Sequence, residues 1–421
     1  MKIAVVGGGG REHAIIKKLS QSSKVTDIYA LPGNGGIGEI AKCIDIKATD
    51  IDGICDFCVT NKIDFVVVAP DDPLVLGAVD RLNALGIKTF GPNKAAAMIE
   101  GSKAFAKELM KKYNIPTAKY EIFDDINKAI SYIKGQDTYP VVIKADGLAL
   151  GKGVIIANNE NEAIKALQSI MKDKVFGDSG SKVVIEEFLT GPEVSVLAFC
   201  DGKTICPMVS SMDHKRALDG DLGPNTGGMG TIAPNPYYTK KIAKQCMDEI
   251  FLPTVKAMEN EGRPFSGCLY FGLMLTKNGP KVIEYNCRFG DPETQVVLPL
   301  LKTDLLDIML AIWDKKLNEI KVEFSDKYAC CIVLASGGYP TKYETGKPIM
   351  FSEQLDVCVY HAGTKLENGY YYTNGGRVLG LTAVADNPHS ARKIAYKAVE
   401  NVRFEGMYYR SDIGMPKKYE V

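Results

Sequence analysis

The sequence has no net charge, no long apolar run and few histidines, and each absence narrows the range of functions. Lysine plus arginine number 51, as do aspartate plus glutamate, so the 421-residue chain has a formal net charge of zero at pH 7. A chain without net charge has no overall field that would favour nucleic acid or an anionic membrane. We therefore expect small-molecule partners, with neither nucleic acid nor a membrane among them.

No apolar stretch approaches the roughly 20 residues that a membrane-spanning helix needs. The chain begins with Met1 and Lys2 and continues into a predicted strand, a pattern unlike that of a signal peptide. We therefore expect a cytoplasmic location. The length favours two to four domains over one core.

Histidine and cysteine give no sign of a nucleophilic or zinc site. The four histidines form no apparent Ser-His or Cys-His arrangement. The eleven cysteines are scattered, and Cys55 and Cys58 form a C-x-x-C motif that lacks a second pair or a histidine at zinc spacing. We interpret the cysteines as small buried hydrophobic residues.

The first hundred residues alternate between strand and helix patterns. Four strands are predicted, in the runs "KIAVVG", "VTDIYAL", "DFVVVAP" and "IKTFGP", with helical patterns between them. This alternation predicts a doubly wound parallel sheet that ends near residue 100.

A second region begins at residue 101, where Ser102 is expected to cap a helix. Strands follow, and then residues 211–236 form a stretch rich in Gly, Pro and Asn. That composition predicts a long loop without strands, a kind of segment that is usually functional or disordered. From about residue 320 the pattern returns to strands and then to a helix over 388–402.

The first glycine run, "VVGGGGREHA", does not fit a dinucleotide site. The third glycine position holds Glu12 or His13, and the second strand offers no acidic residue for a ribose. The glycines allow a tight turn whose N–H groups suit an anion or a hydroxyl-rich ligand. A turn that only packs closely is equally well supported, and an NAD-dependent oxidoreductase would explain the first domain alone.

The segment "VIEYNCRFGDPE" has the pattern of a strand with one polar face. Because strand side chains alternate, Glu284, Asn286 and Arg288 are predicted to share a face. The opposite face is expected to hold Ile283, Tyr285, Cys287 and Phe289. Carboxylate and amide oxygens suit Mg²⁺, and the guanidinium can hold a carboxylate or a transferring phosphoryl group. A solvated face with an ion pair is the alternative.

The segment "VVIKADGLALGKGV" combines lysines and glycines without forming a Walker motif, because Gly153 follows Lys152 where Ser or Thr would stand. It predicts either a nucleotide-binding hairpin or a merely flexible one.

Together these segments resemble the ATP-grasp superfamily and, within it, the glycinamide ribonucleotide synthetase family. The resemblance covers nearly the whole chain, through "GGGGREHA", "KADGLALGKGV", "DHKR", "GPNTGGMG", "EYNCRFGDPETQ" and "GGRVL". It implies an ATP-dependent ligation of glycine to 5-phosphoribosylamine in purine synthesis, through an acyl phosphate, with Mg²⁺ or Mn²⁺. A formyl- or carboxyl-transferring ATP-grasp ligase is an alternative that "GPNTGGMG" and "NCRFGDPETQ" argue against, and a non-catalytic nucleotide-binding protein is another.

The resemblance also implies an α/β and α+β multidomain fold. We expect an N-terminal doubly wound parallel sheet over residues 1–100, a central ATP-grasp domain over 101–318 and a small C-terminal mixed α/β domain over 319–421. A mobile lid is expected at about 117–190. We expect a monomer, with a weak dimer as the alternative.

By the same resemblance, the ATP-binding residues are Lys103, Lys144, Gly151, Lys152, Gly153, Glu186, Glu187, Phe188, Leu189, Glu193 and Lys215. Lys103 and Lys144 would reach the phosphates, and residues 186–189 would read adenine through backbone groups. Glu193 would accept hydrogen bonds from the ribose hydroxyls. The glycines around Lys152 would let a flap fold down over ATP and open again.

The substrate-binding residues implied are Gly9, Gly10, Arg11, Glu12, Asp71, Asp213, Asn225, Gly227, Gly228, Arg288, Asp291, Lys365 and Arg377. Three residues are expected to act in the reaction itself, namely Arg288, Lys144 and Asp213. Glu284 and Asn286 would hold the metal. The preceding strand offers Leu273 and Met274 where many relatives place a further carboxylate, so we expect one firmly held Mg²⁺.

Overall fold

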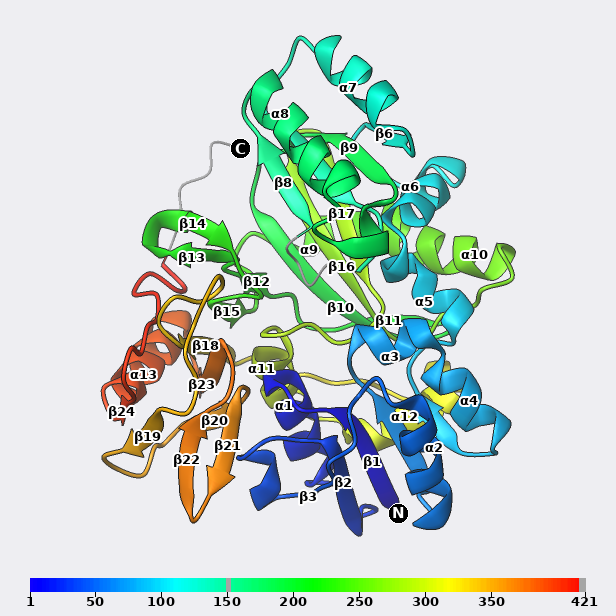
Figure 1. Ribbon diagram of the computed structural model, residues 1–421. Coiled ribbons are helices and arrows are strands. Elements are labelled where there is room, and N and C mark those ends of the chain that lie inside the picture. The colour runs from blue at the N-terminus through cyan, green and yellow to red at the C-terminus, as the bar shows by residue number, and fades with distance from the viewer. Residues whose placement is uncertain (149–152, 416–421) are drawn as a thin grey trace.

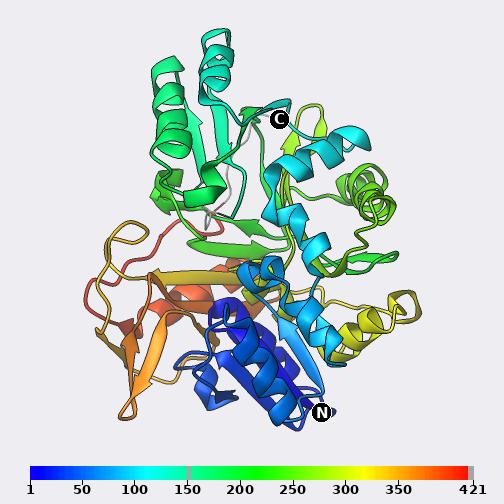
Figure 2. The same ribbon diagram turned by 45° about the vertical axis from the view of Figure 1, so that its right-hand side comes forward.

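The computed structural model describes residues 1–148 and 153–415. Three bodies surround a central sheet: the N-terminal domain at one end, a lid at the other, and the C-terminal domain alongside (Figures 1 and 2). No helix among these residues is long and apolar enough to cross a membrane.

The N-terminal domain is a parallel sheet with the strand order β3-β2-β1-β4-β5. Its strands are β1 (Lys2–Gly7), β2 (Asp27–Pro32), β3 (Lys42–Cys43), β4 (Phe65–Val68) and β5 (Lys88–Phe90). Its helices are α1 (Gly10–Leu19), α2 (Ile51–Thr60), α3 (Asp71–Leu76), α4 (Ala78–Ala84) and α5 (Lys94–Gly101). The parallel sheet is as predicted, with one strand more, because the two residues of β3 are too few to show a pattern. Almost every residue of β1 and β4 is buried, as expected where helices cover both faces of a parallel sheet.

The central sheet is antiparallel, with the order β11-β10-β16-β17. Its strands are β10 (Glu193–Asp201), β11 (Ile205–Pro207), β16 (Ser266–Thr276) and β17 (Gly279–Asn286). Helices α6 (Lys103–Lys112), α9 (Lys240–Cys246), α10 (Leu252–Asn260), α11 (Thr294–Val297) and α12 (Leu305–Trp313) lie around it. Ser102 caps α6 as predicted, since its hydroxyl accepts from the N–H of Phe105.

The lid is a four-stranded antiparallel sheet with its own apolar core. Its strands are β6 (Tyr120–Phe123), β7 (Val141–Ala145), β8 (Val154–Ala157) and β9 (Val183–Glu187), and its helices are α7 (Ile126–Lys134) and α8 (Glu160–Leu167). Side chains of β7 alternate, so that Val141 and Ile143 join the lid core while Val142 and Lys144 face the central cavity.

Residues 211–236 contain strands, so the prediction of a strandless loop was wrong. The strands are β12 (Met212–Asp213), β13 (Arg216–Leu218), β14 (Leu222–Asn225) and β15 (Gly230–Ala233). β13 and β14 form a hairpin, whereas β12 and β15 join the sheet of the C-terminal domain. Strands of two to four residues rich in Gly and Pro carry too little alternation to be recognised, and β15 also pairs with the distant β18.

The C-terminal domain has an inner sheet of order β12-β15-β18-β23-β20, covered by α13 (Pro388–Val399), and an outer sheet of order β21-β22-β19-β24. Its own strands are β18 (Tyr328–Ala335), β19 (Pro348–Phe351), β20 (Cys358–His361), β21 (Thr364–Glu367), β22 (Tyr370–Thr373), β23 (Arg377–Ala385) and β24 (Val402–Arg403). Shorter helical turns elsewhere in the chain are η1 (Ile37–Glu39), η2 (Gln168–Lys172), η3 (Gly177–Gly180), η4 (Asp219–Asp221), η5 (Met247–Phe251), η6 (Leu298–Leu300) and η7 (Leu317–Glu319).

Candidate functional site

A cavity of about 930 Å³ lies where the lid, the central sheet, the β13–β14 hairpin and the C-terminal domain meet. Most of the residues predicted for the site line it: Arg11, Asp71, Lys103, Lys144, Gly153, Glu186, Glu187, Phe188, Leu189, Glu193, Asp213, Lys215, Asn225, Gly227, Glu284, Asn286, Arg288, Asp291 and Arg377. Segments up to about 370 residues apart in the sequence thus converge on one space.

Some predicted residues are not in the lining of this cavity, namely Gly9, Gly10, Glu12, Gly228 and Lys365. Gly151 and Lys152 lie outside the described residues. The ammonium group of Lys365 is 2.8 Å from the carboxylate of Glu367 and lies over the ring of Tyr372. Its predicted contact with a phosphate group stays a prediction.

The first glycine run forms a closely packed turn that presents one cation to the cavity. A Cβ atom at Gly8 would lie 2.2 Å from the carbonyl oxygen of Gly33, so no larger residue fits there without a shift. Glu12 accepts a hydrogen bond from the N–H of Gly9 and pairs with Arg11, both at 2.7 Å. Arg11 lines the cavity. The turn is therefore closely packed, and Arg11 also donates to the carbonyl oxygen of Phe289 at 3.2 Å. Substrate binding by this turn stays a prediction.

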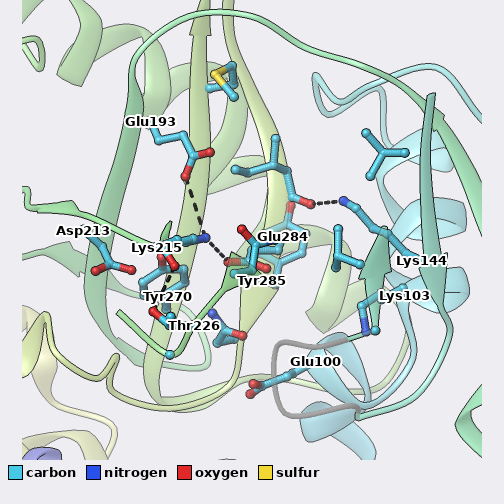
Figure 3. A pocket seen from close by; sticks show the side chains of 18 of the residues that line it. Glu100, Lys103, Lys144, Glu193, Asp213, Lys215, Thr226, Tyr270, Glu284 and Tyr285 are labelled. Carbon is cyan, nitrogen blue, oxygen red and sulfur yellow. Dashed lines mark hydrogen bonds and ion pairs between the residues drawn. The ribbon is translucent and has the colours of Figure 1, made fainter. Parts of the chain in front are cut away.

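Glu284 lies in the middle of the cavity beside Lys215 (Figure 3). The ammonium nitrogen of Lys215 is 2.9 Å from Glu284 Oε1 and 3.8 Å from Glu193 Oε2. The nearby charge of Lys215 lowers the pKa of Glu284 to about 2, so its carboxylate is ionised at neutral pH. Although burial opposes it, Glu284 raises the pKa of Lys215 well above the usual value.

A β-bulge changes which side chains of β17 face the cavity. The register shifts between Gly272 and Leu273 of β16, so that one residue of β17, Ile283, has no direct partner. Ile283 and Glu284 therefore both line the cavity, contrary to the prediction that strict alternation places Ile283 on the other face. Tyr285, also predicted there, likewise borders the cavity, although it is largely buried.

A buried charge cluster holds Lys144 at the lid end of the cavity. Glu186 of β9 is 2.9 Å from the ammonium of Lys144 and 3.0 Å from that of Lys107, and Lys144 also donates to the carbonyl of Ile283 at 2.9 Å. Burial lowers the pKa of Lys107 to about 8. The Lys144–Glu186 contact is an ion pair by distance, without the alignment of a hydrogen bond. Glu186 thus contributes its side chain as well as its backbone to the predicted adenine hinge.

Arg288 lies beyond the end of β17 and pairs with Glu100 of α5. Its Nη2 is 3.0 Å from Glu100 Oε1 and 3.8 Å from Asp71 Oδ2. Glu100 also accepts from the N–H of Cys287 at 2.7 Å and, in the amide orientation that satisfies both groups, from Asn286 at 2.8 Å. The buried Nε of Arg288 has no hydrogen-bond partner among the described residues.

Asp213 belongs to a second polar cluster, at the side of the cavity opposite Lys144 (Figure 3). Burial raises the pKa of Asp213 well above its usual value, and the nearby carboxylate of Glu293 raises it further. Glu293 accepts from Ser195 at 3.1 Å, and the Ser195 hydroxyl is 2.8 Å from that of Tyr270. An ammonium group brought beside Asp213 would favour its ionised form.

Arg377 connects the C-terminal domain to two other segments of the site. Its Nη1 donates to the carbonyl oxygens of Gly227 at 2.7 Å and Asp291 at 2.8 Å, and its Nη2 is 3.2 Å from the Asp291 carboxylate. Gln295 donates to the same carboxylate at 2.8 Å.

Several cavity residues were not predicted from the sequence: Glu100, Lys107, Tyr270, Glu293 and Tyr339. Glu293 stands in the quoted run "NCRFGDPETQ", so its position there could have suggested it. The others lie on helices, in a buried strand or in a C-terminal loop, and they carry no local motif.

Comparison with known proteins gives the same three-part division. The sequence models of the phosphoribosylglycinamide synthetase N domain, ATP-grasp (A) domain and C domain match residues 1–100, 101–294 and 329–416. A phosphoribosylamine–glycine ligase of Caldanaerobacter subterraneus subsp. tengcongensis is 51% identical over 98% of this chain and 99% of its own length. A phosphoribosylamine–glycine ligase of Clostridium acetobutylicum is 48% identical over 99% of this chain and 100% of its own length.

Two solved structures show the same fold at different distances. The crystal structure of phosphoribosylamine–glycine ligase from Thermotoga maritima matches with a TM-score of 0.87 and 35% identity, covering 98% of this chain and all of that one. A biotin carboxylase domain of the Hydrogenobacter thermophilus 2-oxoglutarate carboxylase, in complex with MgADP, ADP and bicarbonate, matches with a TM-score of 0.76. Its identity is 17% over 97% of this chain and 91% of that one, which indicates a shared fold alone.

Proposed function

The chain belongs to the phosphoribosylglycinamide synthetase family, and on that premise we propose that it ligates glycine to 5-phosphoribosylamine. The reaction converts ATP to ADP and phosphate and gives glycinamide ribonucleotide, in purine biosynthesis. One observation carries the assignment to this cavity: among its lining residues are the two lysines expected to reach the phosphates, a carboxylate–amide pair and the arginine that follows them. These are, respectively, Lys103 with Lys144, Glu284 with Asn286, and Arg288.

The reaction needs positioning and neutralisation of charge more than a protein nucleophile. A glycine carboxylate oxygen attacks the γ-phosphorus of ATP, ADP leaves, and glycyl phosphate forms. The amine of phosphoribosylamine then attacks the glycyl carbonyl carbon, phosphate leaves and the amine loses a proton. Arg288 would stabilise the acyl-phosphate oxygens, and Asp213 would accept the glycine ammonium, since both residues line the cavity.

ATP would lie between the lid and the central sheet. Val142 and Ile156 of the lid and Met274 of β16 offer apolar side chains to an adenine ring, and the hinge 186–189 borders the same space. Lys144 and Lys103 lie on one side of Glu284 and can approach the phosphates (Figure 3). Lys103 donates to the carbonyl of Gly147 at 2.9 Å, within the segment "VVIKADGLALGKGV".

The carboxylate of Glu284 and the amide oxygen of Asn286 fit a divalent metal. Glu284 is ionised, and the hydrogen bond of the Asn286 nitrogen to Glu100 leaves its oxygen available. No group of three or more His, Cys, Asp or Glu suited to a metal occurs within residues 1–148 and 153–415, so phosphate oxygens and water would complete the coordination. The hard oxygen donors favour Mg²⁺, with Mn²⁺ as a substitute. When bound, the metal neutralises charge on the phosphate oxygens.

The phosphoribosylamine would occupy the end of the cavity next to the N-terminal domain. Arg11 and Asp71 reach the lining from that domain, and Asp291 with Arg377 face them from the other side. The carboxylates are suited to ribose hydroxyls, and the guanidinium groups to the 5′-phosphate. A monomer in the cytoplasm remains the prediction made from the sequence.

An assay that offers glycine, alanine and formate separately tests the proposal. We expect ADP formation only with glycine, and only when phosphoribosylamine and Mg²⁺ are both present. Turnover with formate, or no glycine-dependent turnover, would overturn the assignment.

A further inference from the structure

We infer that two residues of the C-terminal domain, Tyr339 and Arg410, are positioning residues for ligation, because they fix the segment 213–228 against the cavity. The inference rests on the proposed function, since its readout is glycine-dependent turnover. Neither Tyr339 nor Arg410 belongs to a sequence motif that indicated a role in the site.

The segment 213–228 brings four of the residues predicted for the site to the cavity. Asp213 and Lys215 lie before the β13–β14 hairpin, and Asn225 and Gly227 lie at its end. The hairpin between them is exposed at its tip, where Leu218 and Leu222 are about half-exposed or more. A two-stranded hairpin is marginal by itself, so the segment depends on contacts from elsewhere.

Arg410 anchors the outer part of the hairpin. Its side chain is fully buried and pairs with Asp412 at 2.7 and 2.8 Å and with Asp221 of the hairpin at 2.9 Å. It also donates to the carbonyl oxygen of Arg216 at 3.0 Å. The N–H donors of a guanidinium group have a rigid planar arrangement. The buried Arg410 side chain therefore holds the two carboxylates and the carbonyl oxygen in fixed positions relative to one another.

The neighbours of Arg410 extend the same anchor. The N–H of Gly220 donates to Asp412 at 2.9 Å, and the N–H of Ser411 donates to Asp219 at 2.8 Å. The chain around residues 410–412 and the hairpin around 216–221 are therefore joined side by side, although they lie about 190 residues apart in the sequence.

Tyr339 anchors the inner end of the segment. Its hydroxyl accepts a hydrogen bond of 2.9 Å from the N–H of Gly227, and its ring lies against Gly376, where a Cβ atom would come within 2.2 Å. The carbonyl of the same Gly227 accepts from Arg377, next to Gly376. The C-terminal domain thus binds both the N–H and the carbonyl group of Gly227. Arg377 also binds the carbonyl of Asp291, so it connects the segment 213–228 to that residue.

Tyr339→Phe is the cleanest test, because it removes one oxygen and keeps the ring. We expect the kcat/KM for glycine to fall about five- to tenfold, the effect of one lost hydrogen bond in a positioned site. The apparent KM for ATP should change less than about twofold, because the adenine contacts lie in the lid and the hinge. Unchanged kcat/KM for glycine would overturn the role of Tyr339.

Tyr343→Phe is the matched control. Tyr343 belongs to the same loop, with its ring centroid 6.0 Å from that of Tyr339, and it does not belong to the cavity lining. Equal losses from the two variants would mean that the loop matters only as a whole, and this result would also overturn the assignment to Tyr339.

Arg410 needs two variants, because an altered buried charge can unfold the protein. Arg410→Lys keeps the charge and loses the bidentate geometry, and Asp219→Asn weakens the same anchor from an exposed residue. In both, we expect the KM for glycine to rise while the affinity for ADP, measured by calorimetry, is retained. Normal glycine kinetics in the folded Asp219→Asn protein, or equal losses of glycine and ADP binding in both variants, would contradict a positioning role.

Different results would contradict the proposed function and the positioning role of Tyr339 and Arg410. If the wild-type protein shows no glycine-dependent ADP formation, the proposed function fails and the variants need not be made. If the wild type is active and the Tyr339 and Arg410 variants match it, only the positioning inference fails.

Discussion

The ammonium nitrogen of Lys215 lies 2.9 Å from Oε1 of Glu284, the carboxylate proposed as a metal ligand. A protein cation and a divalent metal would therefore share one carboxylate group. Lys215 neutralises Glu284 in this structure, and the proposed metal would compete with it for the carboxylate.

Replacement of Lys215 by methionine removes the competing cation. In the absence of nucleotide, we expect Lys215→Met to bind Mn²⁺ about two- to fivefold more tightly, which is the range for a half-exposed ion pair. Calorimetry or the Mn²⁺ electron spin resonance signal measures this, and Lys244→Met, on the exposed side of α9, is the control. Weaker metal binding in Lys215→Met would show that Lys215 supports the metal site instead of competing for it.

Glu284→Gln removes the charged ligand without a change in size. We expect turnover to fall about 10- to 100-fold or more, with the fold intact by circular dichroism, because the remaining amide oxygens bind a hard cation poorly. Glu259→Gln, on the exposed side of α10, should leave the rate unchanged. Near-normal turnover of Glu284→Gln at saturating Mg²⁺ would remove the metal role.

Lys107→Met would leave the Glu186 carboxylate with Lys144 as its one remaining cationic partner in the cluster. Both members of the Lys107–Glu186 pair are 3% exposed, but Glu186 keeps Lys144 as a partner. The loss should therefore be about 1–3 kcal/mol of stability, less than for a buried charge left wholly unpaired. The midpoint of thermal unfolding measures this loss of stability. The double variant with Glu186→Gln should recover part of this loss, and a double variant less stable than Lys107→Met would contradict the explanation.

Arg377→Ala should raise the KM for phosphoribosylamine more than tenfold, by about the energy of a charge-assisted hydrogen bond or two. The KM for ATP should change little, because Arg377 contacts Gly227 and Asp291, whereas the adenine contacts are proposed in the lid and the hinge. An unchanged KM for phosphoribosylamine together with altered ATP affinity would place the phosphate elsewhere. Arg377→Lys should give an intermediate value, since it keeps the charge but loses the paired donors.

The contact between the N-terminal and C-terminal domains should weaken in acid. His13 of α1 accepts a hydrogen bond from the N–H of His361 at 2.9 Å. Burial lowers the pKa of His13 to about 3 and that of His361 to about 4, below the usual value of 6.5. The unfolded chain then binds more protons than the folded one between about pH 6.5 and pH 3, so stability falls as the pH drops through that window.

Unfolding midpoints measured from pH 7 to pH 4 test this, with His13→Asn as the comparison. The asparagine oxygen can replace Nδ1 as an acceptor but does not titrate, so the loss of stability with acidification should be smaller. An identical pH profile in the two proteins would exclude His13 as a contributor.

Most of the site residues were predicted from the resemblance of short motifs to a known family, and some also lie in local patterns. The alternation of β17 places Glu284 and Asn286 on the cavity side, and the strand ending near Lys144 was expected from the sequence alone. Ile283 was placed wrongly because a β-bulge depends on the partner strand, which a single-strand pattern does not contain.

Other contacts depend on pairs that are far apart in the chain. Lys107 and Glu186 are separated by about 80 residues, and each looks like an ordinary surface charge in its own helix or strand. Tyr339 and Arg410 were missed for the same reason, since their partners lie about 110 and 190 residues away. Burial of such pairs is a property of the assembled domains and has no local signal.

The pairing of β15 with β18 has a consequence for engineering. β15 belongs to the central part of the chain but completes the sheet of the C-terminal domain. A cut between the two parts would leave β18 with an open edge and would free the segment that carries Gly227. A chimaeric ligase should therefore exchange the chain from residue 101 onward as one unit, because β10 also pairs with β16 in the central sheet. The boundary that matters for recombination follows hydrogen bonds between strands and not the order of domains along the chain.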